Sequence, residues 1–399
     1  MSSKLDQLLA RLCPNGVEYR PLKHFATVSR GGSFQKKDFV PSGFPCIHYG
    51  QIHTKFDIFV DQAITFLTND VAERQRKAES GAIIMAVTSE NLDDVCKAVA
   101  WLGNSEVAVS GHSAIIHHHQ NPKYLSYYFN SIAFSAQKRK LAHGTKVIEV
   151  TPNDLLEVCV PVPPLEVQNE IVRILDKFTE LTAELTAELT ARRKQYEYYR
   201  HVLLMRNSYP HIKLREVGPV CMCKRILKSQ TTDEGIPFYK IGTFGKTPDA
   251  YIPFELFENY KIRYKYPKKG DVLISAAGTI GRTVTFDGEP SYFQDSNIVW
   301  IDNDESKVLN RYLAYCYEEQ PWVSSDGGTI SRLYNENIEK AEIPAPHPEL
   351  QKEIVRILDK FSTLCNDLTS GLPAEIEARK KQYEYYRDKL LNFKPLERA

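Results

Sequence analysis

The sequence predicts an α+β protein in which two similar mixed α/β units are joined by two long antiparallel helices in a coiled-coil spacer, with approximate two-fold symmetry. Two observations lead to this prediction. The same helix-like segment occurs twice in the chain of 399 residues, once in the middle and once near the end. Each copy follows a long stretch in which strand-like and helix-like patterns alternate in a common order. A duplicated unit followed by a duplicated helix indicates an ancient duplication of half the chain.

The two helix-like copies are nearly identical over two segments. QNEIVRILDKF begins at Gln168 and returns as QKEIVRILDKF at Gln351, and RRKQYEYYR begins at Arg192 and returns as RKKQYEYYR at Arg379. Both copies are preceded by prolines, in VPVPPLEV and IPAPHPEL. Prolines fit the first turn of a helix, so each helix is expected to start just after them.

Apolar residues in these segments recur at a helical period. Ile171, Leu175 and Phe178 form one stripe of an amphipathic helix, which we expect to run from Glu170 to Leu204. At ~1.5 Å per residue that helix is about 50 Å long, far beyond the usual length in globular domains. We therefore expect it to pair with the second copy in antiparallel orientation. The alternative is that each helix packs only on its own unit.

The centres of the two helices differ. The first contains the tandem repeat TAELTAEL from Thr182, made of good helix formers, and the second contains TSGLPAE from Thr369, where Gly371 and Pro373 should break or kink the helix. If the first helix sets the distance between the units, removing one TAEL copy shortens it by about 6 Å.

The same order of elements appears in residues 17–165 and 209–348. Each contains an apolar strand, FPCIHYG from Phe44 and IPFYKIG from Ile236, then a glycine-led strand and an aromatic helix. We therefore divide the chain into an N-terminal helical segment (1–16), a first unit (17–165), a central helix (166–208), a second unit (209–348) and a C-terminal helix with its tail (349–399). The N-terminal segment should form a helix from Lys4 to Leu12 that packs near the C-terminal tail.

Composition excludes several classes of protein. No apolar run is long enough to cross a membrane, and the N-terminus lacks the regions of a signal peptide, so a soluble cytoplasmic protein is expected. The 8 cysteines are scattered and form no disulfide framework. Cys221 and Cys223 have no second ligand pair, so no metal is expected. Net charge is +1 and each unit is nearly balanced, so only local basic clusters point to a partner.

Motifs for catalysis are absent from the sequence. NPKY from Asn121 resembles the catalytic loop of adenine methyltransferases but departs at its third position, and Asn121 with Pro122 is better explained as a helix start. Three adjacent histidines, His117 to His119, alternate between the faces of a strand and cannot converge on one metal ion. GTIGR from Gly278 lacks the ending of a phosphate-binding loop. We expect no catalytic residues and no cofactor.

Together, the two variable units, the prolines, the QxEIVRILDKF helices and the KQYEYYR helix ends resemble the specificity (S, HsdS) subunit of type I restriction-modification systems. The TAEL repeat places the resemblance closest to the type IC group. The resemblance covers essentially the whole chain. It implies that the two units are target recognition domains, each reading one half of a bipartite double-stranded DNA site. It also implies that the helices dock two methyltransferase (M) subunits, and that restriction (R) subunits join that core.

If the units bind DNA, two kinds of side chain should contact it. Cations, glycines and small hydroxyls near turns suit phosphate contacts, whereas polar residues at strand ends suit base edges. The predicted DNA-binding residues are Arg30, Gly31, Gly32, Ser33, Lys36, Lys37, Thr88, Ser89, Asn91, Lys138, Arg139, His143 and Lys146 in the first unit, and Lys224, Arg225, Lys228, Lys246, Ser275, Thr279, Arg282, Thr329, Ser331 and Arg332 in the second.

A second class of function fits the same architecture. A structural adaptor with two protein-binding units on a helical spacer needs no nucleic acid, and the near-neutral charge of each unit is compatible with it. Salt separates the two hypotheses, because binding through phosphate contacts weakens steeply between about 50 and 200 mM salt and an apolar interface does not. The bases read by each unit and the length of the gap between half-sites do not follow from the sequence.

Overall fold

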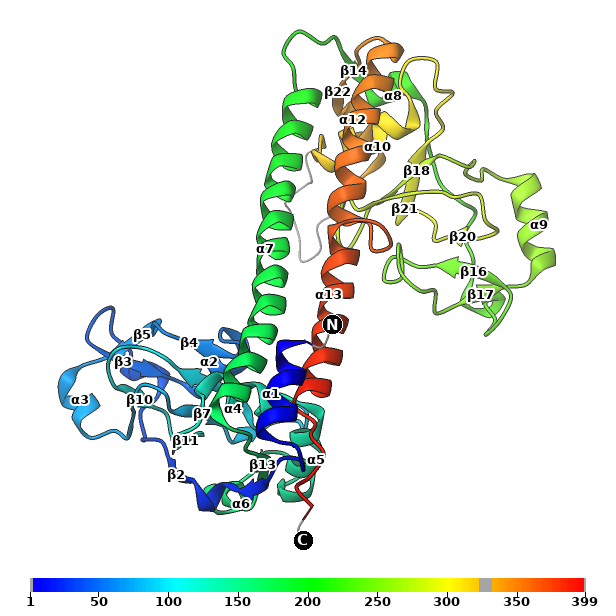
Figure 1. The fold of residues 1–399 in the computed structure, drawn as a ribbon. Coiled ribbons are helices and arrows are strands. Elements are labelled where there is room, and N and C mark those ends of the chain that lie inside the picture. Colours follow the sequence, from blue (N-terminus) through cyan, green and yellow to red (C-terminus); the bar gives the residue numbers. More distant parts are fainter. Residues whose placement is uncertain (1–2, 323–331, 398–399) are drawn as a thin grey trace. The chain divides into compact units, whose positions relative to one another are not determined.

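A computed structural model of the chain describes residues 3–322 and 332–397. The chain divides into two compact units, the first formed by Met1–Thr186 with Glu375–Ala399 and the second by Ala187–Ala374 (Figure 1). Both units contain sheets and helices, so the predicted pair of mixed α/β units with long helices is confirmed. The predicted two-fold relation between the units and the five-segment division stay predictions.

The first unit is built on two sheets. A five-stranded sheet has the order β2-β11-β7-β9-β4 and a four-stranded sheet the order β5-β3-β10-β6, while β1 pairs with β13 and β8 with β12. The strands are β1 (Tyr19–Pro21), β2 (Ala26–Arg30), β3 (Phe44–Ile47), β4 (Phe59–Val60), β5 (Thr65–Leu67), β6 (Lys77–Ala78), β7 (Ile83–Ala86), β8 (Thr88–Ser89), β9 (Lys97–Trp101), β10 (Val107–Val109), β11 (Ser113–His118), β12 (Ile148–Glu149) and β13 (Cys159–Pro161).

Short helices cover these sheets. They are α1 (Lys4–Leu12), η1 (Leu22–His24), η2 (Lys36–Asp38), α2 (Tyr49–Thr54), α3 (Asn69–Glu73), α4 (Pro122–Phe129), α5 (Ile132–Leu141) and α6 (Pro152–Leu156). The predicted N-terminal helix Lys4–Leu12 is confirmed, and Asn121 caps α4 with Pro122 in its first turn, as expected. The aromatic residues of α4 are buried in a core that includes β7, β9 and the start of α7 (Leu165–Leu204).

The second unit repeats this plan, with fewer strands among its described residues. Its sheets have the orders β15-β21-β18-β19 and β17-β16-β20, and β14 pairs with β22. The elements are β14 (His211–Lys213), α8 (Leu214–Val217), β15 (Val220–Cys221), η3 (Lys228–Gln230), β16 (Ile236–Tyr239), β17 (Tyr251–Ile252), α9 (Phe254–Arg263), β18 (Val272–Ser275), β19 (Thr283–Thr285), β20 (Tyr292–Phe293), β21 (Ile298–Ile301), α10 (Asn310–Glu318), α11 (Asn335–Lys340) and β22 (Glu342–Pro344).

Equivalent strands in the two units pair in the same way. In the first unit β3 pairs in parallel with β10, and β11 pairs antiparallel with β7 and β2. In the second unit β16 pairs in parallel with β20, and β21 pairs antiparallel with β18 and β15. In each unit a turn therefore joins one strand of the parallel pair to the antiparallel strand that follows it. The turn from Val109 to Ser113 joins β10 to β11, and the turn from Phe293 to Ile298 joins β20 to β21.

The long helices are one continuous element and one interrupted element. α7 is a single helix of 40 residues and starts at Leu165, directly after the prolines as expected and five residues before the Glu170 from which the predicted span was counted. The second copy divides into α12 (Pro348–Asn366) and α13 (Leu372–Leu390), so the predicted break at Gly371 and Pro373 is confirmed. A Cβ at Gly371 would lie 2.5 Å from the carbonyl oxygen of Thr363, which explains why the chain folds back on the end of α12 only with glycine there.

Within each unit a segment of one copy packs on a segment of the other. In the first unit the rings of Phe178 and Tyr386 stack with centroids 5.3 Å apart. In the second unit Tyr199 and Phe361 stack at 5.8 Å, and Arg193 donates to the carbonyl oxygen of Cys365 at 3.5 Å, so α7 and α12 run antiparallel there. The expected pairing of the copies is therefore present in each unit.

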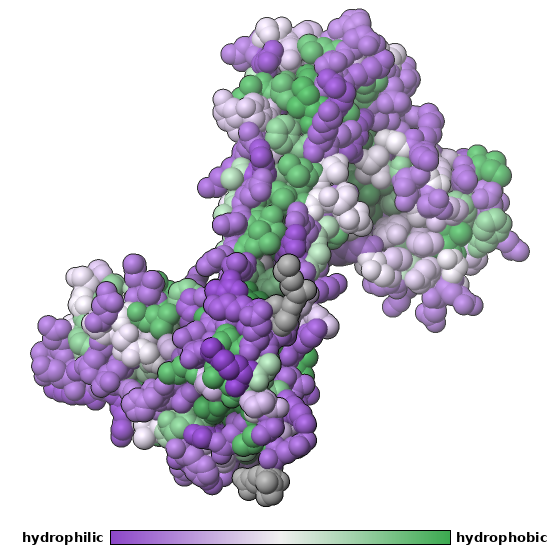
Figure 2. Space-filling model, viewed as in Figure 1, coloured by the Kyte–Doolittle hydropathy of each residue, from purple (hydrophilic) through white to green (hydrophobic). Residues whose placement is uncertain are grey.

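The N-terminus and the C-terminal tail meet in the first unit. Val17 donates to the carbonyl oxygen of Lys394 at 2.9 Å, and Tyr19 donates to that of Phe393 at 3.1 Å. Leu5 and Leu391 are buried in the same core, which confirms the expected packing of the first helix near the tail. Hydrophilic side chains cover most of the surface visible in Figure 2. Among the described residues no helix combines the length and apolarity that a membrane span requires.

Candidate nucleic-acid interface

A fully buried glutamine attaches each long helix to its unit. The side chain of Gln168 accepts a hydrogen bond from the backbone N–H of Asn121 at 3.0 Å and donates to the carbonyl oxygen of Pro163 at 2.7 Å. Gln351 does the same with the N–H of Leu309 at 2.9 Å and the carbonyl of Pro346 at 2.7 Å. Both glutamines have 0% exposure. Buried polar groups of this kind fix one geometry, because leaving any partner unpaired is costly.

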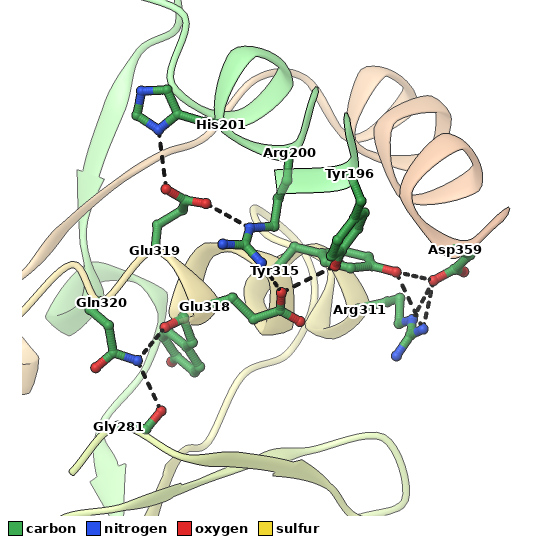
Figure 3. A network of polar contacts seen from close by, with 11 residues as sticks. Tyr196, Arg200, His201, Gly281, Arg311, Tyr315, Glu318, Glu319, Gln320 and Asp359 are labelled. Carbon is green, nitrogen blue, oxygen red and sulfur yellow. Dashed lines mark hydrogen bonds and ion pairs between the residues drawn. The ribbon is translucent and has the colours of Figure 1, made fainter. Parts of the chain in front are cut away.

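A tyrosine and a cation hold an aspartate about two turns further along each helix. In the first unit Tyr127 donates to Asp176 at 2.8 Å, and Lys123 pairs with the same carboxylate at 2.9 Å. In the second unit Tyr315 donates to Asp359 at 2.5 Å and Arg311 pairs with it at 2.6 Å (Figure 3). The aromatic helix of each unit is thereby fixed to the long helix.

The second unit has an additional network at the end of α10. Arg200 of α7 pairs with Glu318 and Glu319, at 2.6 Å to each, and Tyr196 donates to Glu318 at 3.1 Å (Figure 3). Gln320 then donates to the carbonyl oxygen of Gly281 at 3.2 Å. These contacts connect α7 through α10 to the loop that follows β18.

The turn between β10 and β11 lies at the centre of the predicted contacts in the first unit. The hydroxyl of Ser110 accepts from the N–H of Tyr49 at 2.9 Å, and the guanidinium of Arg30 donates to the carbonyl oxygen of Gly111 at 2.7 Å. Thr88 lies 3.0 Å from Nδ1 of His112. The His112 side chain is exposed. Predicted contact residues from two separate segments, Arg30 and Thr88, thus meet at one turn.

Two predicted glycines have a clear structural role beside this turn. A Cβ at Gly31 would lie 2.2 Å from the carbonyl oxygen of Ser110, and a Cβ at Gly32 would lie 2.1 Å from the side-chain oxygen of Gln75. The backbone contact makes glycine necessary at position 31 for the close approach of this loop to the turn, whereas at position 32 the flexible side chain of Gln75 could move aside. Arg30 also pairs with Glu149 of β12 at 2.5 Å, which leaves its guanidinium only partly available.

The equivalent turn of the second unit, between β20 and β21, borders a cavity of about 540 Å³. Arg332 donates to the carbonyl oxygen of Ser296 in this turn at 2.9 Å. The cavity is lined by Arg225, Ile226, Lys228, Thr231, Thr232, Asp233, Phe238, Lys240, Asp249, Ala250, Gln294, Asp295, Ser296, Asn297 and Arg332. The predicted residues Arg225, Lys228 and Arg332, far apart in sequence, are therefore brought together.

Three predicted contact residues are buried and must be corrected. Thr88 is 5% exposed and faces His112, and the ammonium of Lys138, 6% exposed, donates to the carbonyl oxygens of Asp93 and Val95, both at 2.7 Å. Ser275, 2% exposed, donates to the carbonyl oxygen of Thr279 and accepts from the N–H of Arg282. Burial also lowers the pKa of Lys138. Their polar groups serve the fold, and direct DNA contacts by these three are withdrawn.

The other predicted residues differ in their surroundings. Ser33, Lys36, Lys37, Lys146, Lys224, Lys246 and Thr279 are exposed, as are Arg225 and Lys228 at the cavity. Four further residues have partners: Arg139 pairs with Asp93, His143 lies 3.6 Å from Asp154, Asn91 donates to Asp94, and Arg282 donates to the carbonyl oxygen of Phe244. Ser89 lies half-buried in β8. Thr329 and Ser331 lie outside the described residues.

The sequence reasoning missed the two turns themselves. His112 was not predicted, nor was any residue from Gln294 to Asn297. The signal that could have found them is the short polar interruption between two buried apolar strands, SGH in VAVSGHSAII and QDSN in YFQDSNIVWI. Loops that end central strands are where rigid scaffolds usually place binding residues. In the part of the chain that the structure describes, no group of three or more His, Cys, Asp or Glu side chains could hold a metal ion.

Comparison with known proteins identifies the same two halves. A family model described as "Type I restriction modification DNA specificity domain" matches residues 14–192 and again residues 209–378. A putative type I restriction enzyme specificity subunit of Haemophilus influenzae is 54% identical over 303 residues, 73% of this chain and 76% of the relative. The EcoR124I/EcoR124II specificity subunit of Escherichia coli is 34% identical over 267 residues, 58% of this chain and 61% of the relative.

Solved structures share the fold at low sequence identity. A chain from a structure of the type I restriction-modification system, reported for its complex assembly and conformational transition, is 18% identical, with a TM-score of 0.61 over 96% of this chain and 98% of that chain. The S subunit of a type I restriction-modification system from M. genitalium is 14% identical, with a TM-score of 0.51 over 94% and 96%. These likenesses support the two-unit fold with its long helices.

Proposed function

Because the chain belongs to the type I restriction-modification DNA specificity family, we propose that it is the DNA sequence-specificity subunit of a type I restriction-modification complex. It has no catalytic role of its own. Residues 17–165 and 209–348 act as target recognition domains, each reading one half of an asymmetric bipartite site in double-stranded DNA. The long helices set the spacing of the half-sites and dock two methyltransferase subunits, and restriction subunits join that core.

The observation that carries this proposal is the contrast between conserved helices and diverged units within one chain. Three exposed side chains of α7 are repeated in the second copy and are exposed there too: Lys177 as Lys360, Lys194 as Lys381, and Tyr198 as Tyr385. Tyr198 is 64% exposed and Tyr385 is 61% exposed. Packing gives no reason for exposed side chains to stay identical, whereas binding two copies of one partner does, since exposed aromatic residues are frequent anchors of protein interfaces.

The recognition surfaces show the opposite behaviour. At the turns that end the equivalent strands, the first unit has Ser110, Gly111 and His112, and the second has the sequence QDSN from Gln294 to Asn297. Different polar groups at equivalent positions of one scaffold fit two unlike half-sites, because base edges differ in their donors and acceptors. The exposed cations nearby, such as Lys36 and Lys37 in the first unit and Arg225 and Lys228 in the second, suit phosphate contacts, which position without specifying.

Two finer assignments belong to the same proposal. The tandem TAEL repeat in α7 supports placement in the type IC group, because a repeated four-residue helical element is the feature that the resemblance rests on.

A DNA-reading subunit acts where the chromosome is, so we place it in the cytoplasm of its host cell.

Sequencing of methylated genomic DNA tests the proposed function. Cells that express the chain with its cognate methyltransferase subunit are compared with cells that express the methyltransferase subunit alone. We expect a new methylated motif with two short, unlike halves and a fixed gap, present only with the chain. An assembled, soluble complex that yields no such motif would contradict the proposal. Binding of the purified complex to DNA with that motif should weaken steeply between about 50 and 200 mM salt.

A further inference from the structure

We propose that the β10–β11 turn of the first unit and the β20–β21 turn of the second unit read the base edges, through His112 and Asn297 respectively, and that Thr88 is a positioning residue for His112. The inference rests on the proposed function and names the groups that would decide the sequence of each half-site. Neither His112 nor Asn297 was predicted from the sequence, and the contacts that hold the two turns support their role.

Both turns are held rigidly by equivalent contacts. The first side chain of each turn accepts a hydrogen bond from the backbone that follows the neighbouring parallel strand: Ser110 from the N–H of Tyr49 at 2.9 Å, and Gln294 from the N–H of Ile241 at 2.9 Å. A turn that must present donors and acceptors to a base edge has to be fixed before binding, since mobile groups lose free energy when they are ordered.

An arginine from another segment fixes the middle of each turn. Arg30, at the end of β2, donates to the carbonyl oxygen of Gly111, and Arg332, which forms an isolated bridge with Ala277, donates to that of Ser296. The two arginines come from different places in the chain but reach equivalent carbonyls. Each guanidinium therefore holds the backbone of its turn in place, and that of Arg30 is held in turn by its ion pair with Glu149.

In the first unit His112 is the side chain that the turn presents. Its Nδ1 lies 3.0 Å from the hydroxyl of Thr88, and its ring lies 4.9 Å from that of Tyr49. The buried hydroxyl of Thr88 thus engages one ring nitrogen, and Nε2 on the exposed imidazole is left for a ligand. Because a hydroxyl can donate or accept, the contact with Thr88 fixes the orientation of the ring and the direction of Nε2, which offers a base a donor or an acceptor according to the tautomer.

In the second unit the turn is tight and presents Asn297. Ser296 has a φ of 53°, in the left-handed region that residues other than glycine adopt rarely, and the N–H of Asn297 donates to the carbonyl oxygen of Asp295 at 2.6 Å. Such backbone strain persists only where the surrounding contacts hold it. The side chain of Asn297 lines the cavity beside Arg225 and Lys228. A carboxamide can donate to and accept from the N6 and N7 edge of adenine at the same time.

The chemistry of the turns favours bases over phosphates. Asp295 places a carboxylate in the second turn, which repels a phosphate but can accept a hydrogen bond from the amino group of cytosine. The cations that suit phosphates are the exposed Lys36 and Lys37 in one unit and, in the other, the exposed Arg225 and Lys228, which line the cavity beside the turn. Neutral or acidic side chains in the turns suit contacts with bases, and basic side chains elsewhere in the unit suit contacts with phosphates, as expected when different residues make the two kinds of contact.

The test is methylome sequencing of the whole complex with single substitutions. His112→Ala should relax the motif in the half-site read by the first unit only, with discrimination at one base pair falling by about tenfold or more, since a good base contact is worth a factor of that size. Asn297→Ala should relax the other half-site only. Each variant carries its own internal control, because the half-site of the unaltered unit must not change. His119→Ala, an exposed histidine just beyond the opposite end of β11, should leave the motif intact.

The positioning role of Thr88 is tested by the methylated motif, which should not change if Thr88 only fills space in the core. Thr88→Val keeps the shape but removes the hydroxyl, and it should relax the same base position as His112→Ala. Thr88→Ser restores the hydroxyl and should restore the wild-type motif. A Thr88→Val complex with an unchanged motif would overturn this role.

Other outcomes distinguish the inference from the proposed function. If the wild-type complex gives a bipartite motif and both alanine variants leave it unchanged, base reading by the turns is wrong and the specificity function stands. If His112→Ala weakens binding equally at all sequences and lowers the salt slope by about one, His112 contacts a phosphate and base reading by it is overturned. If the wild-type complex gives no motif, the specificity function fails first.

Discussion

The two units attach to the long helices by the same contacts but differ in the turns that face a ligand. Gln168 and Gln351 are both fully buried and make matching hydrogen bonds, whereas His112 and Asn297 differ in size, chemistry and support. A junction must keep one geometry, so its buried polar groups allow little change. A reading surface must change when the target changes. The duplication therefore kept what orients the units and varied what they present.

Identical residues of the junction nevertheless have unlike surroundings. Glu170 is 3% exposed and pairs with Lys4 of α1 at 2.9 Å and with Arg173. Its equivalent Glu353 has a side chain that is 62% exposed and pairs only with Arg356 among the described residues. The N-terminal helix covers Glu170 through Lys4, and in the described part of the chain no helix covers Glu353 in this way. The same glutamate is therefore expected to contribute differently to the free energy of unfolding in the two copies.

The largest effect expected is a change in the gap between the two half-sites, caused by shortening the helix α7 that connects the units. Both connections between the units are helical, at Thr186 in α7 and at Glu375 in α13. Deletion of one TAEL copy removes about 6 Å of α7, so the gap of the bipartite motif should shorten by on the order of two base pairs, with both half-sites unchanged. Methylome sequencing measures this. Loss of either half-site would show that the helix does not act as a ruler.

The next largest effect tests whether the two junctions are equivalent. Gln168→Leu leaves the N–H of Asn121 and the carbonyl of Pro163 buried without their partner, and Gln351→Leu does the same to Leu309 and Pro346. We expect each to destabilise its unit by about 2–4 kcal/mol, because orphaned buried groups cost about 1–3 kcal/mol each. Calorimetric unfolding of the intact chain measures this.

The exposed neighbour Lys352 supplies the matched control for the glutamine variants. Lys352→Asn should change stability by less than about 0.5 kcal/mol. A cost near zero for one glutamine and a large cost for the other would break the equivalence of the junctions.

The smallest effect distinguishes the two glutamates. A hydrogen bond from Arg173 and the ion pair with Lys4, working against burial, lower the pKa of Glu170 to about 2. A folded-state pKa below the unfolded value of about 4.3 means that the contribution is complete above that pH and is lost as the pH falls toward 2. Glu170→Gln should therefore cost about 1–2 kcal/mol at pH 7 and almost nothing near pH 2.

The matched variant of the second copy is Glu353→Gln. It should cost at most about 0.5 kcal/mol at pH 7, since exposed ion pairs contribute little. Denaturant unfolding at several pH values measures both variants. Equal costs at pH 7 would show that the cover by α1 has no energetic consequence.

Several elements could be predicted because their causes are local. The period of Ile171, Leu175 and Phe178 predicted α7, Asn121 before Pro122 predicted the start of α4, and Gly371 with Pro373 predicted the break between α12 and α13. The prolines predicted where α7 starts, but the span counted from Glu170 was five residues too short, because the stretch that follows Pro164 has no clear apolar period.

The candidate site could be predicted only in part. Local sequence identified the basic clusters and the glycines Gly31 and Gly32, but Thr88, Lys138 and Ser275, chosen for their polar side chains, are buried in the fold. His112 was overlooked: the polar interruption SGH indicates a turn, but only the contacts with Thr88 and Tyr49 show that its histidine is held in one orientation.

The sequence by itself determined the duplication, the helical stripes, the break in the second helix and the family, since each of these is written in residues that are neighbours along the chain or repeated in it. The tertiary structure alone decided which polar side chains are buried, which turns are held rigid and which distant cations meet at one cavity. The physical reason is that burial and hydrogen bonding depend on pairs brought together by strand pairing, such as Arg30 with Gly111 and Arg332 with Ser296. No local pattern specifies those pairs.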